Sequence, residues 1–157
     1  MEQRISIKEK AQGAMKAMYG LGSYLRKSSV EENLFHLIYF RVSQINGCAY
    51  CLDMHSKDLR ANGETEQRLY MINAWRESPG YTKRERVALA WAEAVTLIAD
   101  GHVPDEVFEE AKEVFTDEEL IDLTMGIIAI NSYNRINIAF RTPAGTYQVG
   151  EHAVQTN

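Results

Sequence analysis

The stretch INGCAYCLDMHSKDLRANG, residues 45–63, contains both cysteines of this 157-residue chain. They are Cys48 and Cys51, and His55 follows four residues after the second cysteine. The stretch is predicted to be a helix over residues 47–61, and at helical spacing the cysteines and the histidine share one face. Residues four apart on a helix can touch, which brings an imidazole to a thiol.

This arrangement favours reactive thiols. The thiolate is the nucleophilic form of cysteine, and the positive end of a helix lowers the pKa of a cysteine in the first turn. His55 can take the thiol proton or, as an imidazolium, stabilise the thiolate. One cysteine can then be oxidised to a sulfenic acid, the other can resolve it as a disulfide, and an external dithiol can reduce that disulfide.

Two other interpretations of the same residues remain open. Free cysteine is often buried as a small apolar side chain, so the group can simply fill the core. Alternatively, Cys48, Cys51 and His55 can bind zinc together with one more histidine. Structural zinc sites usually place Cys-x-x-Cys in a turn rather than a helix, and a chain of this length has enough core without a metal. We therefore expect neither a metal nor another cofactor.

Composition limits the class of protein. The chain is 45% hydrophobic and 25% charged, as in soluble globular proteins, and its length fits one domain over residues 1–157. Its net charge of −5, with acids and bases interspersed, argues against nucleic-acid binding. No apolar run reaches the roughly 18 residues of a membrane span, and MEQRISIKEKAQ at the start lacks a signal-peptide core. We expect a cytoplasmic protein without membrane association. Structural disulfides are rare in the cytoplasm, so the cysteine pair is expected to be catalytic, redox-sensing or metal-binding.

Helical patterns dominate the rest of the chain. Apolar residues recur at spacings of three and four, and no segment alternates as a strand would. We predict an all-α domain of six or seven helices, approximately at residues 5–19, 30–44, 47–61, 65–76, 83–99, 104–115 and 117–140.

Local signals mark the ends of these helices. Capping boxes fit SVEE, TKRE and TDEE, which begin at Ser29, Thr82 and Thr116. Asn46 is a plausible N-cap for the cysteine helix, and Pro104 fits a first helical position. In the apolar last helix we expect three polar residues either to pair across a subunit interface or to face solvent: Asn131, Asn134 and Arg135.

The sequence around the cysteines resembles a known family. Residues 41–69 (RVSQINGCAYCLDMHSKDLRANGETEQRL) and 88–96 (ALAWAEAVT) are similar to the AhpD-like alkylhydroperoxidases of the carboxymuconolactone decarboxylase superfamily. INSYNRINIAFR at 130–141 is similar to their last helix. The resemblance is strongest over residues 34–98 and closest to short peroxidase-related members. Since the decarboxylases of the superfamily lack the cysteine pair, the resemblance favours a peroxidase.

The resemblance implies an AhpD-like helical fold that assembles as a homotrimer or homohexamer. It also implies thiol-dependent reduction of alkyl hydroperoxides in antioxidant defence. In the family the second cysteine reacts with the peroxide and the first resolves it, which gives these roles to Cys51 and Cys48, and the family histidine falls on His55. The expected partners are a hydroperoxide substrate and a dithiol or thiol-protein reductant.

The chain departs from the family at the proton relay. The family usually has a glutamate twelve residues before the first cysteine, and here that position is His36. His36 can act as a base because its ordinary pKa lies near neutrality, with Glu32 one turn earlier to orient it. Otherwise it is a satisfied core histidine. The resemblance places a second carboxylate, Glu93, near the site, where its burial would require a partner. Tyr50 stands where the family sometimes has histidine.

The sequence thus predicts an oxidoreductase of the alkylhydroperoxidase or peroxiredoxin type, with Cys51, Cys48, His55, His36 and Glu93 as its site residues. Two alternatives remain. The cysteine pair can be a redox sensor whose disulfide changes assembly without turning over a peroxide. Or the chain can be a zinc-stabilised helical module.

Overall fold

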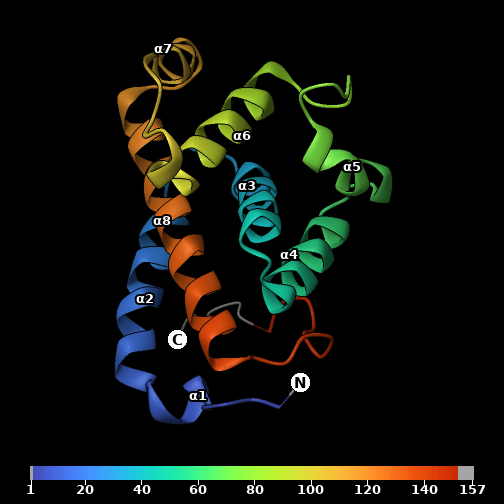
Figure 1. Cartoon of the computed structure of the whole chain (residues 1–157), viewed down its shortest axis with the longest axis vertical. Helices are drawn as coiled ribbons and strands as arrows, with labels where there is room; N and C mark the ends of the chain where they lie inside the picture. The colour runs from blue at the N-terminus through green and yellow to red at the C-terminus, as the bar shows by residue number, and fades with distance from the viewer. Residues whose placement is uncertain (1, 152–157) are drawn as a thin grey trace.

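The computed structural model describes residues 2–151, which form an all-helical domain (Figure 1). Within this range there are eight α-helices and two short 3-10 helices, η1 and η2. The all-α class is confirmed, with slightly more α-helices than the six or seven predicted. The elements are α1 Ile7–Lys10, α2 Gln12–Leu25, α3 Glu32–Asn46, α4 Ala49–Ala61, α5 Glu66–Met71, η1 Ile72–Ala74, α6 Lys83–Thr96, η2 Ile98–Asp100, α7 Asp105–Val114 and α8 Asp117–Phe140.

The extra helix arises where one predicted helix is divided. The helix expected at 5–19 is interrupted at Ala11, whose φ of −127° and ψ of 31° are not helical, and α2 continues beyond it to Leu25. The capping boxes at Thr82 and Thr116 are both confirmed. The one predicted at Ser29 is wrong, because α3 begins at Glu32 without a side-chain cap.

Helix α3 is the centre of the fold and packs against α4, α6 and α8. Figure 1 shows α3 between α4 on one side and the α2–α8 pair on the other, with α6 crossing one end. Its apolar residues are correspondingly buried, with Ile38 and Val42 fully excluded from solvent. Because α3 leads directly into α4, the cysteine helix is anchored to the best-packed part of the molecule.

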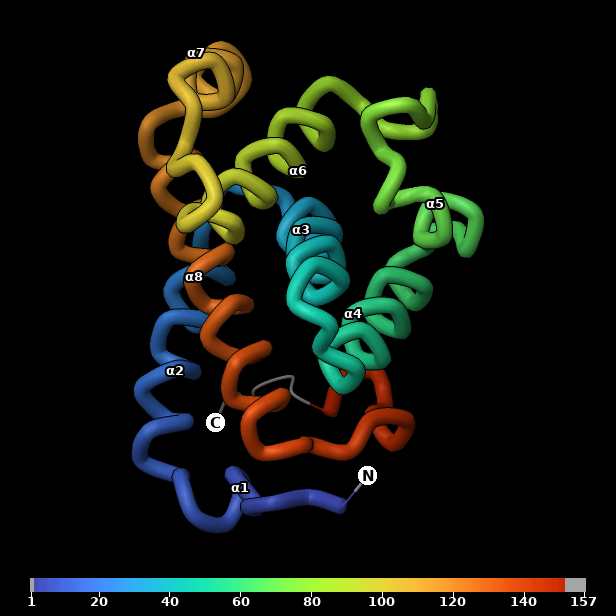
Figure 2. Tube along the Cα trace, viewed as in Figure 1, coloured from blue at the N-terminus to red at the C-terminus, as the bar shows by residue number. Residues whose placement is uncertain are grey.

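The chain after α8 returns to α4 (Figure 2). We call residues 142–151 the C-terminal strap. Lys57 of α4 donates to the carbonyl of Tyr147 at 3.0 Å, and the Tyr147 hydroxyl donates to Asp58 at 2.8 Å. The main-chain N–H of Gly145 donates to Asp53 at 3.0 Å. The strap therefore fixes the polar face of the cysteine helix.

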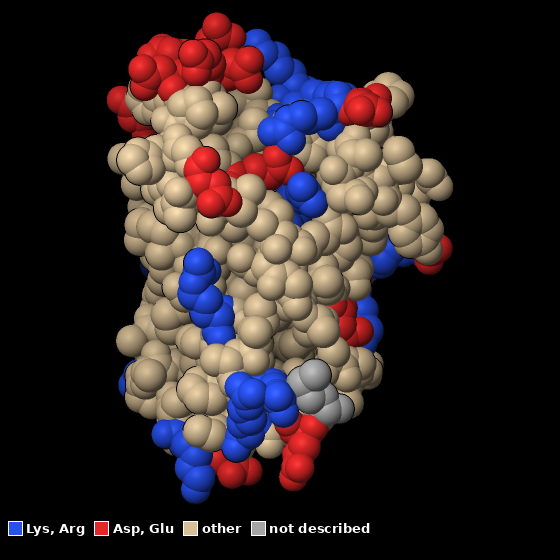
Figure 3. Space-filling view, in the orientation of Figure 1, with Lys and Arg blue, Asp and Glu red and all other residues tan. Residues whose placement is uncertain are grey.

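Charged side chains are distributed unevenly over the surface. Figure 3 shows acidic groups gathered over the end that carries α7, with basic groups beside them and at the opposite end. The acidic residues of α7 are Asp105, Glu106, Glu109, Glu110 and Glu113. Along the part of the chain that the structure describes, no helix is both long and apolar enough to cross a membrane.

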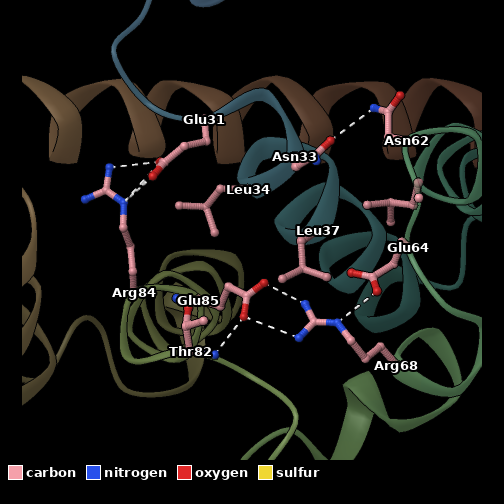
Figure 4. Close-up of a pocket in the computed structure, with 12 residues that line it drawn as sticks. Glu31, Asn33, Leu34, Leu37, Asn62, Glu64, Arg68, Thr82, Arg84 and Glu85 are labelled. Atoms are coloured by element: carbon pink, nitrogen blue, oxygen red, sulfur yellow. Dashed lines mark hydrogen bonds and ion pairs between the residues drawn. The ribbon is translucent and has the colours of Figure 1, made fainter.

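A surface hollow where α3 meets α6 is crossed by ion pairs (Figure 4). On one side Arg84 binds Glu31 through both carboxylate oxygens and also binds Glu119. On the other side Arg68 bridges Glu64 and Glu85. Each arginine is thus paired with two glutamates, and these ion pairs join α3, α5, α6 and α8 around the hollow.

The close approach of α8 to α3 depends on Gly126. A Cβ atom at this position would lie 2.7 Å from Cε1 and 2.9 Å from Cδ1 of the Phe35 ring. We expect Gly126→Ala to lower the free energy of unfolding by about 1–2 kcal/mol, because overpacking outweighs the gain in helix propensity. Gly20 in α2 is a matched control, since a Cβ there has no neighbour within 4 Å. Gly20→Ala should stabilise by about 0.5–1 kcal/mol. Urea denaturation measures both, and equal stabilisation would contradict the close approach.

Candidate active site

The chain turns from α3 into α4 through only two residues, Gly47 and Cys48. Gly47 has a left-handed backbone with φ of 70°, which glycine adopts at little cost. The N–H of Cys48 then bonds to the carbonyl of Ser43, closing the end of α3. The sequence suggested Asn46 as the N-cap of α4, but Asn46 is the last residue of α3. The N-cap of α4 is Cys48 itself.

Cys48 and Cys51 form a disulfide with their Cα atoms 5.3 Å apart. Each cysteine is only 1% exposed. The sulfur of Cys48 also accepts the main-chain N–H of Cys51 at 3.3 Å, so it lies at the positive end of α4. A loop this short removes little chain entropy, about 2 kcal/mol at most. The value of the bond is therefore chemical more than structural.

His55 lies one turn beyond Cys51 on the same face of α4 and is 5% exposed. Neither of its ring nitrogens has a hydrogen-bond partner among the described residues. Burial, together with the nearby charge of His36, lowers the pKa of His55 to about 3. The imidazole is therefore neutral near pH 7. This excludes the imidazolium role predicted for it, and because so low a pKa makes His55 a weak base, His55 can pass a thiol proton on but does not hold it near pH 7.

His36 meets this site from α3. Its ring centroid is 5.9 Å from that of His55, and its Nε2 is 3.7 Å from a carboxylate oxygen of Glu32. Tyr39 lies beside both histidines, with ring centroids 5.4 Å and 6.2 Å away. Burial raises the pKa of the Tyr39 hydroxyl, so that phenol stays protonated. The structure thus brings His36 and His55 together, while the role of His36 in a proton relay stays a prediction.

Asn137 of α8 is a site residue that the sequence reasoning missed. Its Nδ2 donates to the sulfur of Cys51 at 3.6 Å. An amide donor at this position can stabilise a thiolate on Cys51. A signal was present, because Asn131, Asn134 and Asn137 recur every third residue and mark one face of α8.

The other two asparagines join α8 to the end of α3. Asn46 donates to the side-chain oxygens of Asn131 and Asn134, each at 2.9 Å. Asn134, which is fully buried, donates in turn to the Ser43 hydroxyl. The expectation that these residues pair across a subunit interface or face solvent is wrong for Asn134, which is fully buried, whereas Asn131 is only partly buried. They bond within the chain and hold the last turn of α3, next to the cysteines, against α8.

Glu93 is held by three hydrogen-bond donors. Its carboxylate accepts from Arg41 at 2.7 Å, from the indole N–H of Trp75 at 2.9 Å, and from Arg76. Burial favours a raised pKa, but these three donors outweigh it and the pKa of Glu93 is lowered. The prediction that a buried Glu93 needs a partner is therefore confirmed. A carboxylate held anionic in this way is a poor proton carrier, and its place in the relay stays a prediction.

A family model agrees with this geometry. The model for the carboxymuconolactone decarboxylase family matches residues 12–94, more than half of the chain. That range contains both cysteines, both histidines of the site and Glu93.

Similar proteins cover nearly the whole chain. YdfG, an uncharacterized protein of Bacillus subtilis (strain 168), is 44% identical over 93% of this chain and 99% of its own length. ATU0492 of Agrobacterium tumefaciens, a protein of unknown function suggested to be the antioxidant defence protein AhpD, is 42% identical. Its crystal structure has a TM-score of 0.89 and covers 93% of this chain and 100% of its own.

More distant structures share the fold. A peroxidase-related protein from Silicibacter sp. TM1040 is 23% identical, with a TM-score of 0.76 over 85% of this chain and 71% of its own. The debrominase Bmp8 is also 23% identical, with a TM-score of 0.77 over 88% of this chain and 74% of its own. The cysteine helix, its histidines and these likenesses together show that the chain belongs to the carboxymuconolactone decarboxylase family and has the AhpD-like fold.

Proposed function

We propose that this protein is a thiol-dependent hydroperoxide reductase whose redox group is the pair Cys48 and Cys51. The observation that carries the proposal is their disulfide at the first turn of α4, near a neutral His55 whose ring nitrogens have no partner within residues 2–151. Reactive cysteines are found at helix N-termini because the thiolate is stabilised there. The likeness to AhpD-related and peroxidase-related proteins supports the same reaction.

In the proposed cycle the Cys51 thiol gives up its proton through His55 to His36, the base expected from the sequence, and Asn137 donates to the resulting thiolate. The thiolate attacks the outer oxygen of the hydroperoxide. The O–O bond breaks, leaving a sulfenic acid on Cys51 and an alkoxide that takes up a proton to become the alcohol. The Cys48 thiol then attacks the sulfenic sulfur and releases water as the disulfide forms. An external dithiol returns both cysteines to thiols and is itself oxidised.

The cycle predicts catalytic consumption of a hydroperoxide when a dithiol is supplied. We expect wild-type protein to consume many equivalents of hydrogen peroxide or cumene hydroperoxide with dithiothreitol, and Cys48→Ser/Cys51→Ser to show only the uncatalysed rate. Peroxide loss and dithiol oxidation should match one to one. A disulfide that forms and reduces reversibly without turnover would favour the redox-sensor alternative instead. The physiological reductant and the homo-oligomer implied by the family remain predictions.

A further inference from the structure

We infer that His36, His55 and Asp58 form a binding site for a divalent transition-metal ion. One donor atom from each of the three lies within 4.8 Å of the other two, the one such group found among residues 2–151. His36 comes from α3, whereas His55 and Asp58 are three residues apart on one face of α4. Because α3 and α4 pack together, the fold itself holds the three donors on facing surfaces.

The distances suit a single ion after a small adjustment. Zinc binds imidazole nitrogen and carboxylate oxygen at roughly 2.0–2.2 Å, so two ligand atoms on one ion are at most about 4 Å apart. The three donor atoms all lie within 4.8 Å of one another, so side-chain shifts on the order of 1 Å bring them to these distances. The site is deepest at His55 and reaches the surface at His36 and Asp58, which are only partly buried. An ion can therefore enter from the surface at His36 and Asp58.

An independent observation also points to a ligand. Buried polar atoms in proteins are nearly always hydrogen-bonded. Among the described residues, the two buried ring nitrogens of His55 have no hydrogen-bond partner, and neither does Nδ1 of His36. All three belong to the two histidines of this cluster. A metal ion would supply the missing partner for a nitrogen on each ring, and a neutral imidazole is the form that binds metals.

The carboxylate of the cluster is already oriented. Oδ1 of Asp58 accepts a hydrogen bond from the hydroxyl of the buried Tyr147, which reaches α4 from the C-terminal strap. Groups of this kind, which hold a metal ligand in place, are a regular part of metal sites. Glu32, beside His36, adds a second negative charge close to the place an ion would occupy.

The donor set selects the class of ion. Imidazole nitrogen suits zinc, copper, nickel and iron, whereas magnesium and calcium prefer sites made only of oxygen. Three protein ligands leave a position open for water or a small anion. The site differs from the zinc site considered from the sequence, because it contains a carboxylate and no sulfur. It can therefore bind an ion while Cys48 and Cys51 are joined.

Zinc binding by the disulfide form tests the inference. Tag-free, fully oxidised protein is titrated with Zn²⁺ by calorimetry, and the visible spectrum of added Co²⁺ reports the ligands. We expect one ion per chain. His36→Ala and Asp58→Asn should each weaken binding by more than about 100-fold, and Tyr147→Phe by about 10–100-fold. His102→Ala is the matched control, because His102 lies in an exposed loop, and it should bind as the wild type does.

Two results would overturn the site. One is the absence of stoichiometric binding by the oxidised wild type. The other is binding that appears only after reduction, survives His36→Ala and is lost in Cys48→Ser/Cys51→Ser, which would assign the ion to the thiolates. Circular dichroism of each variant separates loss of a ligand from loss of the fold. The test measures binding by oxidised protein, so its outcome is independent of peroxide turnover.

Discussion

Cys51→Ser is expected to lower the rate of peroxide reduction by at least about 10³-fold, because it removes the nucleophile on which every later step depends. Cys48→Ser should behave differently. It keeps the attacking thiol and loses only the group that resolves the sulfenic acid. A single rapid turnover should therefore survive, followed by slow recycling. Stopped-flow measurement of the first turnover, with mass spectrometry of the product, distinguishes the two variants.

The structure also contains an argument for the opposite assignment of the cysteines. The sulfur of Cys48 receives a main-chain N–H at the N-cap, whereas the sulfur of Cys51 has the Asn137 amide. Asn137→Ala should raise the thiol pKa of Cys51 and slow the first turnover, and it should leave the pKa of Cys48 unchanged. If instead Cys51→Ser retains the rapid first turnover and Cys48→Ser loses it, the roles are reversed and Cys48 is the nucleophile.

Glu93→Gln is expected to lower the free energy of unfolding by about 3 kcal/mol. It removes the charge from a buried carboxylate that binds two arginines and an indole, and so leaves Arg41 without its counter-ion. The side chain of Glu93 is only 11% exposed, so water screens the pair weakly. Glu113→Gln is the matched control. That carboxylate is 68% exposed and pairs with Lys83, and its loss should cost less than about 1 kcal/mol.

The stability of the Glu93 cluster should depend on pH with a definite sign. The pKa of Glu93 is lower in the folded than in the unfolded chain. Its contribution is therefore complete above the unfolded pKa and is lost as the pH falls through the folded pKa. The difference between wild type and Glu93→Gln should shrink in acid. If Glu93→Gln keeps full stability but slows peroxide reduction, the carboxylate belongs to the relay as the sequence suggested.

Features that join residues close together in the sequence could be predicted, and features that join distant residues could not. Two such features are the capping boxes at Thr82 and Thr116 and the shared helix face of Cys51 and His55. Each depends on residues at most four apart, so the geometry of a single helix determines it. The contact of His36 with Glu32 is of the same kind. The family resemblance supplied the expectation that His36 belongs with the cysteines, and the structure places its ring 5.9 Å from that of His55.

The missed features depend on other parts of the fold. Asn137 reaches Cys51 across 86 positions and Tyr147 reaches Asp58 across 89. No local pattern joins either pair. The need of Glu93 for a partner could be predicted, but the choice of Arg41 could not, since it follows from how α3 and α6 cross. Cys48 was missed as an N-cap because helix caps are usually serine, threonine, asparagine or aspartate, whose oxygens accept strongly.

That cap has an evolutionary consequence. Cys48 both starts α4 and carries half of the disulfide, and only the second task requires sulfur. Serine starts helices better than cysteine does, so a descendant with serine at this position would keep its helix and lose the disulfide, and with it dithiol recycling, in one step. The reverse step is equally short. Lineages built on this scaffold can therefore gain or lose dithiol recycling without crossing an unfolded intermediate.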